Sequence, residues 1–362
     1  MLAAVAEVAL PPFFQVLVAP AGFPRTKPRA LNVALPLARG AFTVIYDAED
    51  VPQPDQLRLS VAEFARQPPD VACLQARLSI DNTGDSWLSK MFTIEYAGLF
   101  DVLNPGLARM DCPLPLGGTS NHFRTRVLQG LGGWDAFNVT EDADLGIRMA
   151  LKGWRVADLP STTTEEAPAR LEPWMNQRVR WMKGFVQVCI THSRHPVRAA
   201  RALGPVRFLG AVTMTAGTVL SALSFPVLTA LSLYGLFDGS LLVVRSWGEA
   251  LSSSVALVLF GAGLAAMIGP GFAGVTRRGW RELRPWALLL PAYYLLVSAA
   301  AWRALYELAL APLRWNKTEH GMAKTSRRIA RLQPAESRSL TASSGGRFRL
   351  KVRTKRPWPS KR

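Results

Sequence analysis

Three long stretches without charged residues dominate the second half of the chain. They cover Phe208–Phe237, Leu251–Phe272 and Pro285–Ala301. A membrane-crossing helix needs roughly 20 apolar residues, and a helix in a soluble core would carry polar positions that these stretches lack. We therefore predict a membrane region in residues 206–313 with about three apolar segments, the first of them kinked at Pro226.

The first half of the chain alternates short apolar runs with amphipathic stretches, as strands and helices do when they follow one another. The run Ala41–Tyr46 is apolar throughout, which is typical of a strand buried on both faces. Ser161–Arg170 is polar and is predicted to be a loop. The other predicted strands are Phe13–Pro20, Val71–Leu78 and Arg155–Leu159, and the predicted helices are Arg29–Leu37, Pro54–Gln67, Trp87–Leu103 and Glu172–Ile190. This order predicts an α/β fold with crossover helices.

The charge of the chain changes the membrane prediction. Net charge is +17, and residues 323–362 hold 13 Lys or Arg against one acid, so +12 belongs to this tail. Three full spans would place the tail across the membrane from the basic segment Arg194–Arg207, against the positive-inside rule. We therefore expect one of the three segments to be re-entrant or interfacial, and the sequence leaves open which one.

The tail and the cysteines exclude some classes of function. The tail lacks apolar periodicity, so it is predicted to be disordered and able to contact anionic lipid. Nucleic-acid binding is not favoured, because membrane segments adjoin the tail and the sequence shows no binding domain with interleaved aromatics. The three cysteines are far apart and form no CxxC pair, which argues against a disulfide framework or a zinc site and favours a reduced, cytosolic setting.

The strongest chemical signal lies in the stretch Leu116–Trp154. Three carboxylates, Glu141, Asp142 and Asp144, fall just after Thr140, at the start of an amphipathic run with helical spacing. A helix capped at Thr140 with acids in its first turn would explain this pattern by itself. The approach to it, however, contains His122 and the glycines Gly117, Gly118, Gly132 and Gly133. That much backbone freedom indicates a ligand close to the main chain.

A second acidic group follows the apolar run Ala41–Tyr46. Asp47, Glu49 and Asp50 lie directly after this predicted strand. Open α/β sheets bind ligands at the carboxyl ends of their strands, and carboxylates there can hold Mg²⁺ or Mn²⁺ together with substrate phosphates. The alternative is a solvated turn.

The predicted helix Glu172–Ile190 places Gln177, Arg180, Trp181 and Gly184 on one face. Arginines beside a tryptophan can bind a diphosphate while the indole packs on an apolar ring or on lipid. An interfacial helix with snorkelling arginines is the alternative.

These pieces occur in an order that resembles the processive, membrane-bound family 2 glycosyltransferases, which include cellulose, hyaluronan and poly-N-acetylglucosamine synthases. The similarity covers roughly residues 27–321. Its motifs are Lys27–Asn32, Asp47–Asp50 with Pro52 and Pro54, Thr140–Asp142, Gln177–Trp181 and Trp315–Gly321.

The resemblance implies a fold and a division into domains. Residues 1–170 would form a partial GT-A (Rossmann-like) domain, followed by interfacial helices in 171–205, the transmembrane region in 206–313 and the basic, disordered tail in 314–362. Such proteins are multi-pass proteins of the bacterial inner membrane, with the catalytic domain in the cytoplasm. Their partners are a nucleotide-diphosphate sugar, a glycan acceptor and membrane lipid, with an export subunit as a further candidate.

The resemblance also assigns roles to single residues. Asp142, with Glu141 beside it, would be the general base of an inverting sugar transfer, and Asp47, Glu49 and Asp50 would hold the metal ion. Glu49 replaces the usual second Asp. Donor and diphosphate contacts are assigned to Lys27, Gln177, Arg178, Arg180 and Trp181, and Trp181 would also support the acceptor end. Acceptor contacts are assigned to Gly118, Thr119, Ser120 and His122.

Family members usually carry an earlier strand-and-helix half that binds the nucleotide. Only 26 residues precede Lys27 here, and none of them is Asp. We expect the chain to correspond to the carboxyl two-thirds of such an enzyme and to bind nucleotide sugar weakly as it stands. Two alternatives remain open: sugar transfer to a lipid-phosphate carrier, and a non-catalytic membrane remnant or partner subunit.

Overall fold

The computed structural model describes residues 11, 13–239, 246–311 and 323–325. The strands are β1 (Phe42–Ile45), β2 (Val51–Pro52), β3 (Val71–Ile80), β4 (Asn121–Arg124) and β5 (Arg155–Glu165). The helices of the first part are α2 (Lys27–Ala34), η1 (Leu35–Leu37), α3 (Gln56–Arg66), α4 (Trp87–Gly98), η2 (Leu99–Leu103), α5 (Asn104–Arg109), α6 (Thr125–Gly130) and α7 (Glu141–Leu151). Those that follow are α8 (Leu171–His192), α9 (Pro196–Leu203), α10 (Pro205–Val212), η3 (Thr213–Gly217), α11 (Thr218–Phe237), α12 (Trp247–Arg277), η4 (Arg281–Leu283), η5 (Pro285–Leu289) and α13 (Leu290–Leu310).

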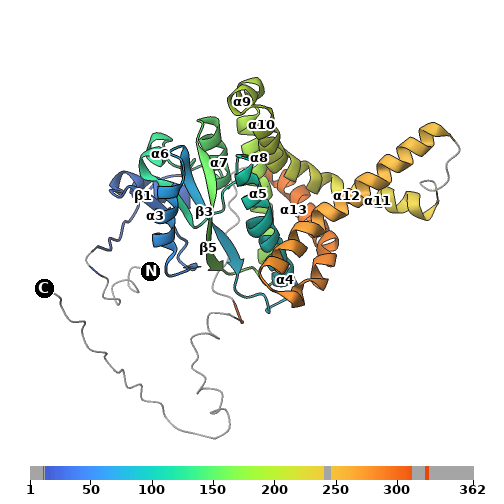
Figure 1. The fold of residues 1–362 in the computed structure, drawn as a ribbon, viewed down its shortest axis with the longest axis horizontal. Helices are drawn as coiled ribbons and strands as arrows, with labels where there is room; N and C mark the ends of the chain where they lie inside the picture. Colours follow the sequence, from blue (N-terminus) through green and yellow to red (C-terminus); the bar gives the residue numbers. More distant parts are fainter. Residues whose placement is uncertain (1–10, 12, 240–245, 312–322, 326–362) are drawn as a thin grey trace, which may run out of the picture. The chain divides into compact units, whose positions relative to one another are not determined.

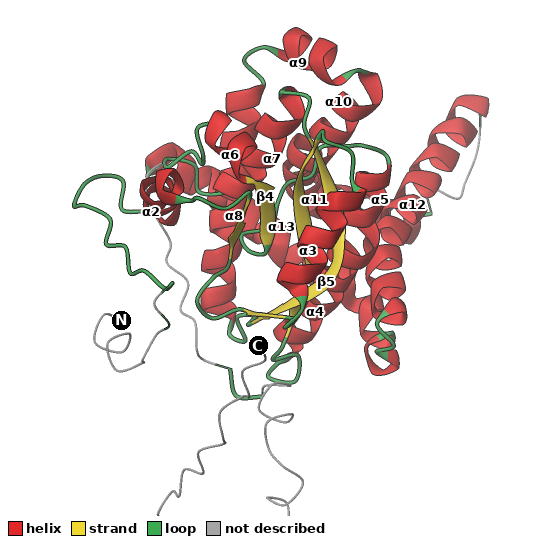
Figure 2. Ribbon diagram, turned by 60° about the vertical axis from the view of Figure 1, so that its left-hand side comes forward, coloured by secondary structure: helices red, strands yellow, loops and turns green. Residues whose placement is uncertain are grey.

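The strands form one mixed sheet in the order β1-β4-β3-β5-β2. The central strand β3 is parallel to β5 and antiparallel to β4. Nine of its ten residues are buried, because helices cover both of its faces. Phe64 of α3 packs with Leu74 and Ala76 on one face, whereas Leu145 of α7 packs with Cys73 on the other. Figure 2 shows the strands enclosed between these helices.

Three local predictions about this sheet are wrong. β1 pairs only with β4 at the sheet edge and is half-buried, so the expected burial on both faces is absent. Residues 13–20 are irregular rather than a strand, and most of their apolar side chains are exposed. β5 continues to Glu165, where a loop was predicted from Ser161, because β3 offers a pairing partner along this whole length.

The apolar second half forms long helices, as predicted. The helical stretches Pro205–Phe237, Trp247–Arg277 and Arg281–Leu310 are long and apolar enough to cross a membrane, judged by length and composition. α8 packs on α13 and is linked to α4 by the Arg178–Glu95 ion pair, and a common core joins these helices to the end of β3. In Figure 1, α11 and α12 extend beyond the helices that surround the sheet. The motif Trp315–Gly321 and nearly all of the basic tail lie outside the described residues.

Candidate active site

The amino end of α7 is the centre of the candidate site. Thr140 is the residue before the helix, and its backbone N–H is held by the Asn138 side-chain oxygen at 3.0 Å. Glu141, Asp142 and Asp144 then fall in the first helical turn, as the sequence predicted. The helix dipole stabilises negative charge at this end, so the backbone partly offsets the cost of gathering three carboxylates.

Glu141 and Asp142 are both buried, with exposed fractions of 6% and 9%. Burial raises the pKa of Asp142 well above its ordinary value, and the neighbouring Glu141 raises it further. Burial also raises the pKa of Glu141, although Lys27 and Arg180 oppose this shift. A carboxylate that binds a proton more tightly than usual is a stronger base, which is what proton abstraction requires.

Lys27 joins two segments that are far apart in sequence. Its ammonium group forms an ion pair with Asp47 and donates a hydrogen bond to the Gly118 carbonyl at 2.7 Å. Burial alone would lower the pKa of Lys27, but the carboxylates of Asp142 and Asp47 together raise it. Gly118 lies beside Asp142, since a Cβ added to it would stand 3.6 Å from Asp142 Oδ2. The structure therefore brings Lys27, Asp47, Gly118 and Asp142 together, as expected.

The loop after β1, which carries Asp47, Glu49 and Asp50, forms the next part of the site. Burial raises the pKa of Asp50 to about 6, and the Thr119 hydroxyl opposes the shift. The same hydroxyl accepts a hydrogen bond from the Asp47 backbone N–H at 3.3 Å, so Thr119 lies at the acidic loop. Glu49 is exposed. Within the part of the chain that the structure describes, no three His, Cys, Asp or Glu side chains gather closely enough to hold a metal by themselves.

The donor set nevertheless fits a divalent cation that is shared with a substrate. Mg²⁺ commonly takes one or two carboxylates from the protein and its other ligands from phosphates and water. Asp47 and Asp50 supply two carboxylates, and Asp50 Oδ2 is buried without a hydrogen-bond partner among the described residues.

Glu165 is a further acid of this region, and the sequence reasoning missed it. It stands at the end of β5, and its burial raises its pKa to about 8, with Asp50 adding to the shift. An acid at the carboxyl end of a strand would have been a signal, but this segment was predicted to be a loop.

One face of α8 turns toward the acids. Arg180 lies close enough to Glu141 and Asp47 for their charges to raise its pKa, although burial lowers the pKa overall. One turn further on, a side chain at Gly184 would collide with Thr140, so the glycine allows α8 to approach the start of α7. The Gln187 side-chain oxygen accepts a hydrogen bond from the Val139 N–H at 3.2 Å. α8 therefore holds the loop that leads into the acidic turn.

The other face of α8 turns away from the acids. Arg178 is only 3% exposed, forms an ion pair with Glu95 of α4 and donates to the Tyr293 hydroxyl at 2.8 Å. Its guanidinium lies over the rings of Phe92, Trp174, Trp181 and Tyr293. Arg178 is thus enclosed where α8, α4 and α13 meet, and the partly buried Trp181 packs against the same core. Gln177 is also buried.

Two of the expected acceptor residues lie on the opposite face of the sheet from α7. Ser120 is fully buried and donates to Thr163 Oγ1 at 2.6 Å. His122 alternates along β4 with Phe123, which belongs to the α7-facing core, and it lines a cavity of about 270 Å³ between β1 and α3. Burial lowers the pKa of His122 to about 4. Of the four expected acceptor residues, only Gly118 and Thr119 lie with the acids.

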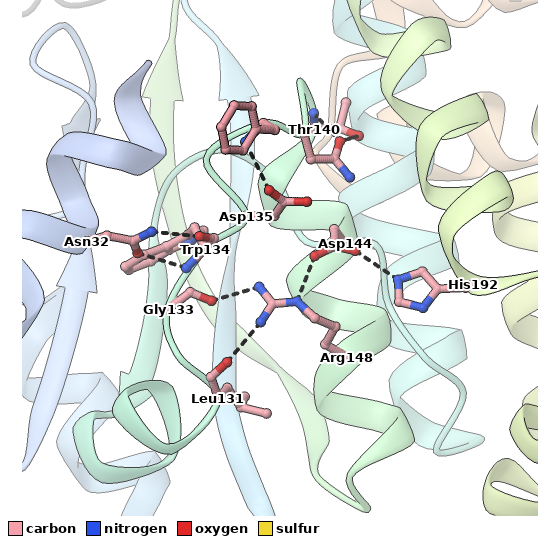
Figure 3. Close-up of polar contacts among 11 residues, drawn as sticks. Asn32, Leu131, Gly133, Trp134, Asp135, Thr140, Asp144, Arg148 and His192 are labelled. Atoms are coloured by element: carbon pink, nitrogen blue, oxygen red, sulfur yellow. Dashed lines mark hydrogen bonds and ion pairs between the residues drawn. The ribbon is translucent and has the colours of Figure 1, made fainter. Parts of the chain in front are cut away.

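A network of ion pairs and hydrogen bonds around Asp144 holds α7 to the neighbouring segments (Figure 3). Asp144 accepts hydrogen bonds from Arg148 Nε at 2.7 Å and from His192 Nε2 of α8 at 2.8 Å. Arg148 also donates to the carbonyls of Leu131 and Gly133 at 3.1 and 2.7 Å. Arg148 therefore joins the turn that contains Gly132 and Gly133 to α7, and the contact between Asp144 and His192 joins α7 to α8. The sequence reasoning placed Asp144 among the acids but did not find its partners.

Comparison with known proteins finds similarity to several mannosyltransferases. The chain is 28% identical over 144 residues to probable glucomannan 4-beta-mannosyltransferase 1 of Arabidopsis thaliana and to probable glucomannan 4-beta-mannosyltransferase 3 of Oryza sativa subsp. japonica. Each match covers 40% of this chain and 26% of the relative, so the chain matches about a quarter of the length of these curated relatives.

A solved structure of the mannosyltransferase PcManGT from Pyrobaculum calidifontis, in complex with GDP-Man and Mn2+, is 22% identical with a TM-score of 0.41. That match covers 78% of this chain and 67% of the other. The family model for glycosyl transferase family group 2 matches residues 42–302, nearly three quarters of the chain, from β1 into α13. The chain therefore belongs to glycosyl transferase family group 2.

Proposed function

We propose that this chain transfers a sugar, with inversion, from a nucleotide-diphosphate donor to a glycan acceptor at a membrane. One observation carries the proposal: five separate segments of the chain bring Lys27, Asp47, Gly118, Asp142 and Arg180 together at one acidic site. Family membership supports the same class of reaction.

Asp142 is the proposed general base. Its carboxylate accepts the proton of the acceptor hydroxyl while the acceptor oxygen bonds to the anomeric carbon and the bond from that carbon to the diphosphate breaks. The raised pKa of Asp142 favours this proton transfer. Gly118 leaves open the space in front of the carboxylate, because any side chain there would approach Asp142 Oδ2.

Lys27 and Arg180 are the proposed cationic contacts of the diphosphate. Both lie within the field of the site carboxylates, where a fixed cation stabilises developing negative charge better than water does. Asp47 and Asp50 are the proposed ligands of Mg²⁺ or Mn²⁺, which would neutralise charge on the diphosphate when bound. When the donor binds, Lys27 exchanges its ion pair with Asp47 for a contact with the diphosphate.

The relatives are named as glucomannan mannosyltransferases, so an activated mannose is the first donor to test. We propose a β-linked glycan as the acceptor. The apolar helices support a membrane location for the reaction, and the proposed compartment is the inner membrane of a bacterium with the α/β domain in the cytoplasm.

The test is sugar transfer by the full chain in lipid nanodiscs. The purified protein is incubated with a panel of radiolabelled nucleotide sugars that includes GDP-mannose, with Mg²⁺ or Mn²⁺ or with chelator. We expect a polymeric product that depends on the cation and is absent for Asp142→Asn. Label recovered only in organic-soluble lipid would instead indicate transfer to a lipid-phosphate carrier. Turnover that is unchanged in Asp142→Asn would refute the proposed base.

A further inference from the structure

Two phenylalanines that are far apart in sequence form an exposed pair on the surface of the α/β domain. The ring centroids of Phe23 and Phe137 are 6.0 Å apart. Their exposed fractions are 71% and 57%. Aromatic rings that served only to stabilise the fold would lie in the core, as Trp134 and Phe123 do. An exposed apolar patch that two separate segments build together is the kind of surface that binds a ligand.

The backbone that carries Phe137 is held on both sides of this residue. The side chain of Asn32 in α2 exchanges two hydrogen bonds with the backbone of Trp134, at 2.7 and 2.9 Å (Figure 3). The backbone N–H of Phe137 donates to Asp135 Oδ1 at 2.9 Å, and Gln187 of α8 holds Val139. These contacts fix the loop without using the Phe137 ring, so the ring is left for a contact with another molecule.

The segment that carries Phe23 is fastened to the same loop. The Thr26 hydroxyl donates to the carbonyl of Ala136, the residue before Phe137, at 3.0 Å. Arg29 of α2 donates to the Pro20 carbonyl at 2.8 Å, and Pro24, directly after Phe23, is buried. The backbone contacts therefore hold the two rings side by side before any ligand binds.

Both rings stand a short length of chain away from the proposed reacting groups. Phe23 precedes Lys27 by four residues, so their Cα atoms are at most about 14 Å apart. Phe137 precedes Asp142 by five residues, which gives an upper limit of about 18 Å. These lengths correspond to a few sugar units of an extended glycan. An acceptor whose end lies at Asp142 can therefore reach the rings with its preceding units.

The geometry of the pair favours a sugar over the flat base of a nucleotide. The planes of the two rings are inclined by 58°, so a flat base that stacked on one ring could not lie parallel to the other. A pyranose ring is puckered, and its C–H groups form apolar patches that suit the electron-rich faces of two inclined aromatic rings. Asp135, which accepts the Phe137 N–H, is exposed beside the pair, and its carboxylate is an acceptor for sugar hydroxyls.

We infer that Phe23 and Phe137 form a platform that binds the acceptor glycan through sugar units that precede the reacting one. The inference rests on the proposed function, because it takes a β-linked glycan as the acceptor. The rings are open to solvent, which suits a polymer that lies mostly outside the protein. Binding of these units keeps the acceptor end near Asp142, and the rings themselves take no part in the transfer.

The test is binding of oligosaccharides to the full chain in lipid nanodiscs, measured by calorimetry without a donor. The probes are β-1,4-linked mannose oligosaccharides, from the single sugar to the hexamer. We expect the affinity of the unmodified chain to rise once the oligosaccharide is long enough to reach the rings. Phe137→Ala and Phe23→Ala should each weaken binding of the hexamer by about tenfold and leave binding of the single sugar unchanged. Phe137→Trp keeps an aromatic face and should keep the rise.

The chain offers a matched control in a second exposed pair. The ring centroids of Phe13 and Phe14 are 5.1 Å apart, and Phe14 is 55% exposed. Phe14→Ala removes a ring of similar exposure that is further in sequence from Lys27, so it should bind every oligosaccharide as the unmodified chain does. Hexamer binding that is equal in Phe137→Ala and the unmodified chain would overturn the inference, as would no binding of any oligosaccharide. Weaker binding of GDP-mannose by Phe137→Ala, with hexamer binding unchanged, would show that the rings stack on the base and would also overturn it.

This binding measurement is separate from the measurement of sugar transfer, because the donor is absent. A chain that binds the hexamer through its two rings but transfers no sugar would contradict the proposed function and leave the platform in place. A chain that transfers sugar, and whose Phe137→Ala variant binds the hexamer normally, would contradict the platform alone. The unfolding temperature of Phe137→Ala should equal that of the unmodified chain, since the ring is exposed.

Discussion

Arg178 and Arg180 stand two residues apart on α8 and serve opposite faces of the same helix. Arg178 is enclosed by four aromatic rings and paired with Glu95, whereas Arg180 lies in the field of Glu141 and Asp47. The first face joins α8 to α4 and α13, and the second holds the amino end of α7 through Gly184. The comparison shows how one short motif can both join α8 to neighbouring helices and complete a candidate active site.

The largest expected effect on the rate of sugar transfer comes from a change at Asp142 of α7. Asp142→Asn removes the proposed base, and general-base catalysis contributes about 10²–10⁴-fold, so transfer should fall by that factor. Folding should be retained, because the amide has the same shape and carries no buried charge. Sugar transfer and the thermal unfolding temperature are measured together. Loss of both in parallel would mean that Asp142 has a structural role.

Arg178→Ala, on the face of α8 that meets α4, should lower the stability of the fold. The change leaves Glu95 partly buried without its cation, and breaking a buried pair costs about 3–5 kcal/mol. We expect an unfolding midpoint well below that of the unmodified chain in the same detergent. The double variant Arg178→Leu/Glu95→Gln removes both charges and should recover much of the loss. Equal destabilisation in the single and double variants would argue against the ion pair as the cause.

Arg180→Ala should reverse this pattern. Removing one preorganised donor to a developing charge costs about 10²–10³-fold in rate, and Arg180 lies in the field of Glu141 and Asp47. Transfer should drop while the unfolding midpoint stays near that of the unmodified chain. An unchanged rate would show that both faces of α8 are structural.

The close approach of α8 to α7 can be tested at Gly184. Gly184→Ala would press a methyl group against Thr140, and overpacking of this kind costs about 1–3 kcal/mol. We expect a lower unfolding midpoint and a lower transfer rate, because the helix that carries Arg180 must move from the acidic turn. Gly263→Ala on α12 is the matched control, since nothing lies within 4 Å of a Cβ added there.

The smallest expected effect is a shift in pH dependence. In the proposed mechanism, transfer requires the ionised carboxylate of Asp142, whose pKa is raised by burial, so the rate should fall as pH drops through that raised pKa. The midpoint of this acid limb should lie above the ordinary Asp value of about 3.9. Lys27 lowers the pKa of Asp142, so Lys27→Met should move the limb to higher pH. A limb at the same pH in both proteins would exclude this coupling.

The sequence by itself determined features that depend on local pattern. The acids of Glu141–Asp144 fall at a helix start, as predicted, although the Thr140 side chain makes no capping hydrogen bond to the helix, and the apolar segments are helices of spanning length. The order of the motifs also predicted the family, which the family comparison confirms. These features are readable because each depends on residues that are neighbours in the chain.

Only the tertiary structure decided which partner each element meets. An apolar run has the same sequence at a sheet edge as at its centre, so β1 could not be recognised as half-buried. Helical spacing puts Arg178 and Arg180 on different faces, but it does not tell which face meets the acids. Likewise, the sequence shows that α13 is apolar enough to span a membrane, but only the tertiary structure shows that it packs on α8. Which strands pair, which helix face meets the site and which side chains are buried are decided by segments far apart in sequence. The reason is that the free energy of burial depends on what covers a surface and not on the surface alone.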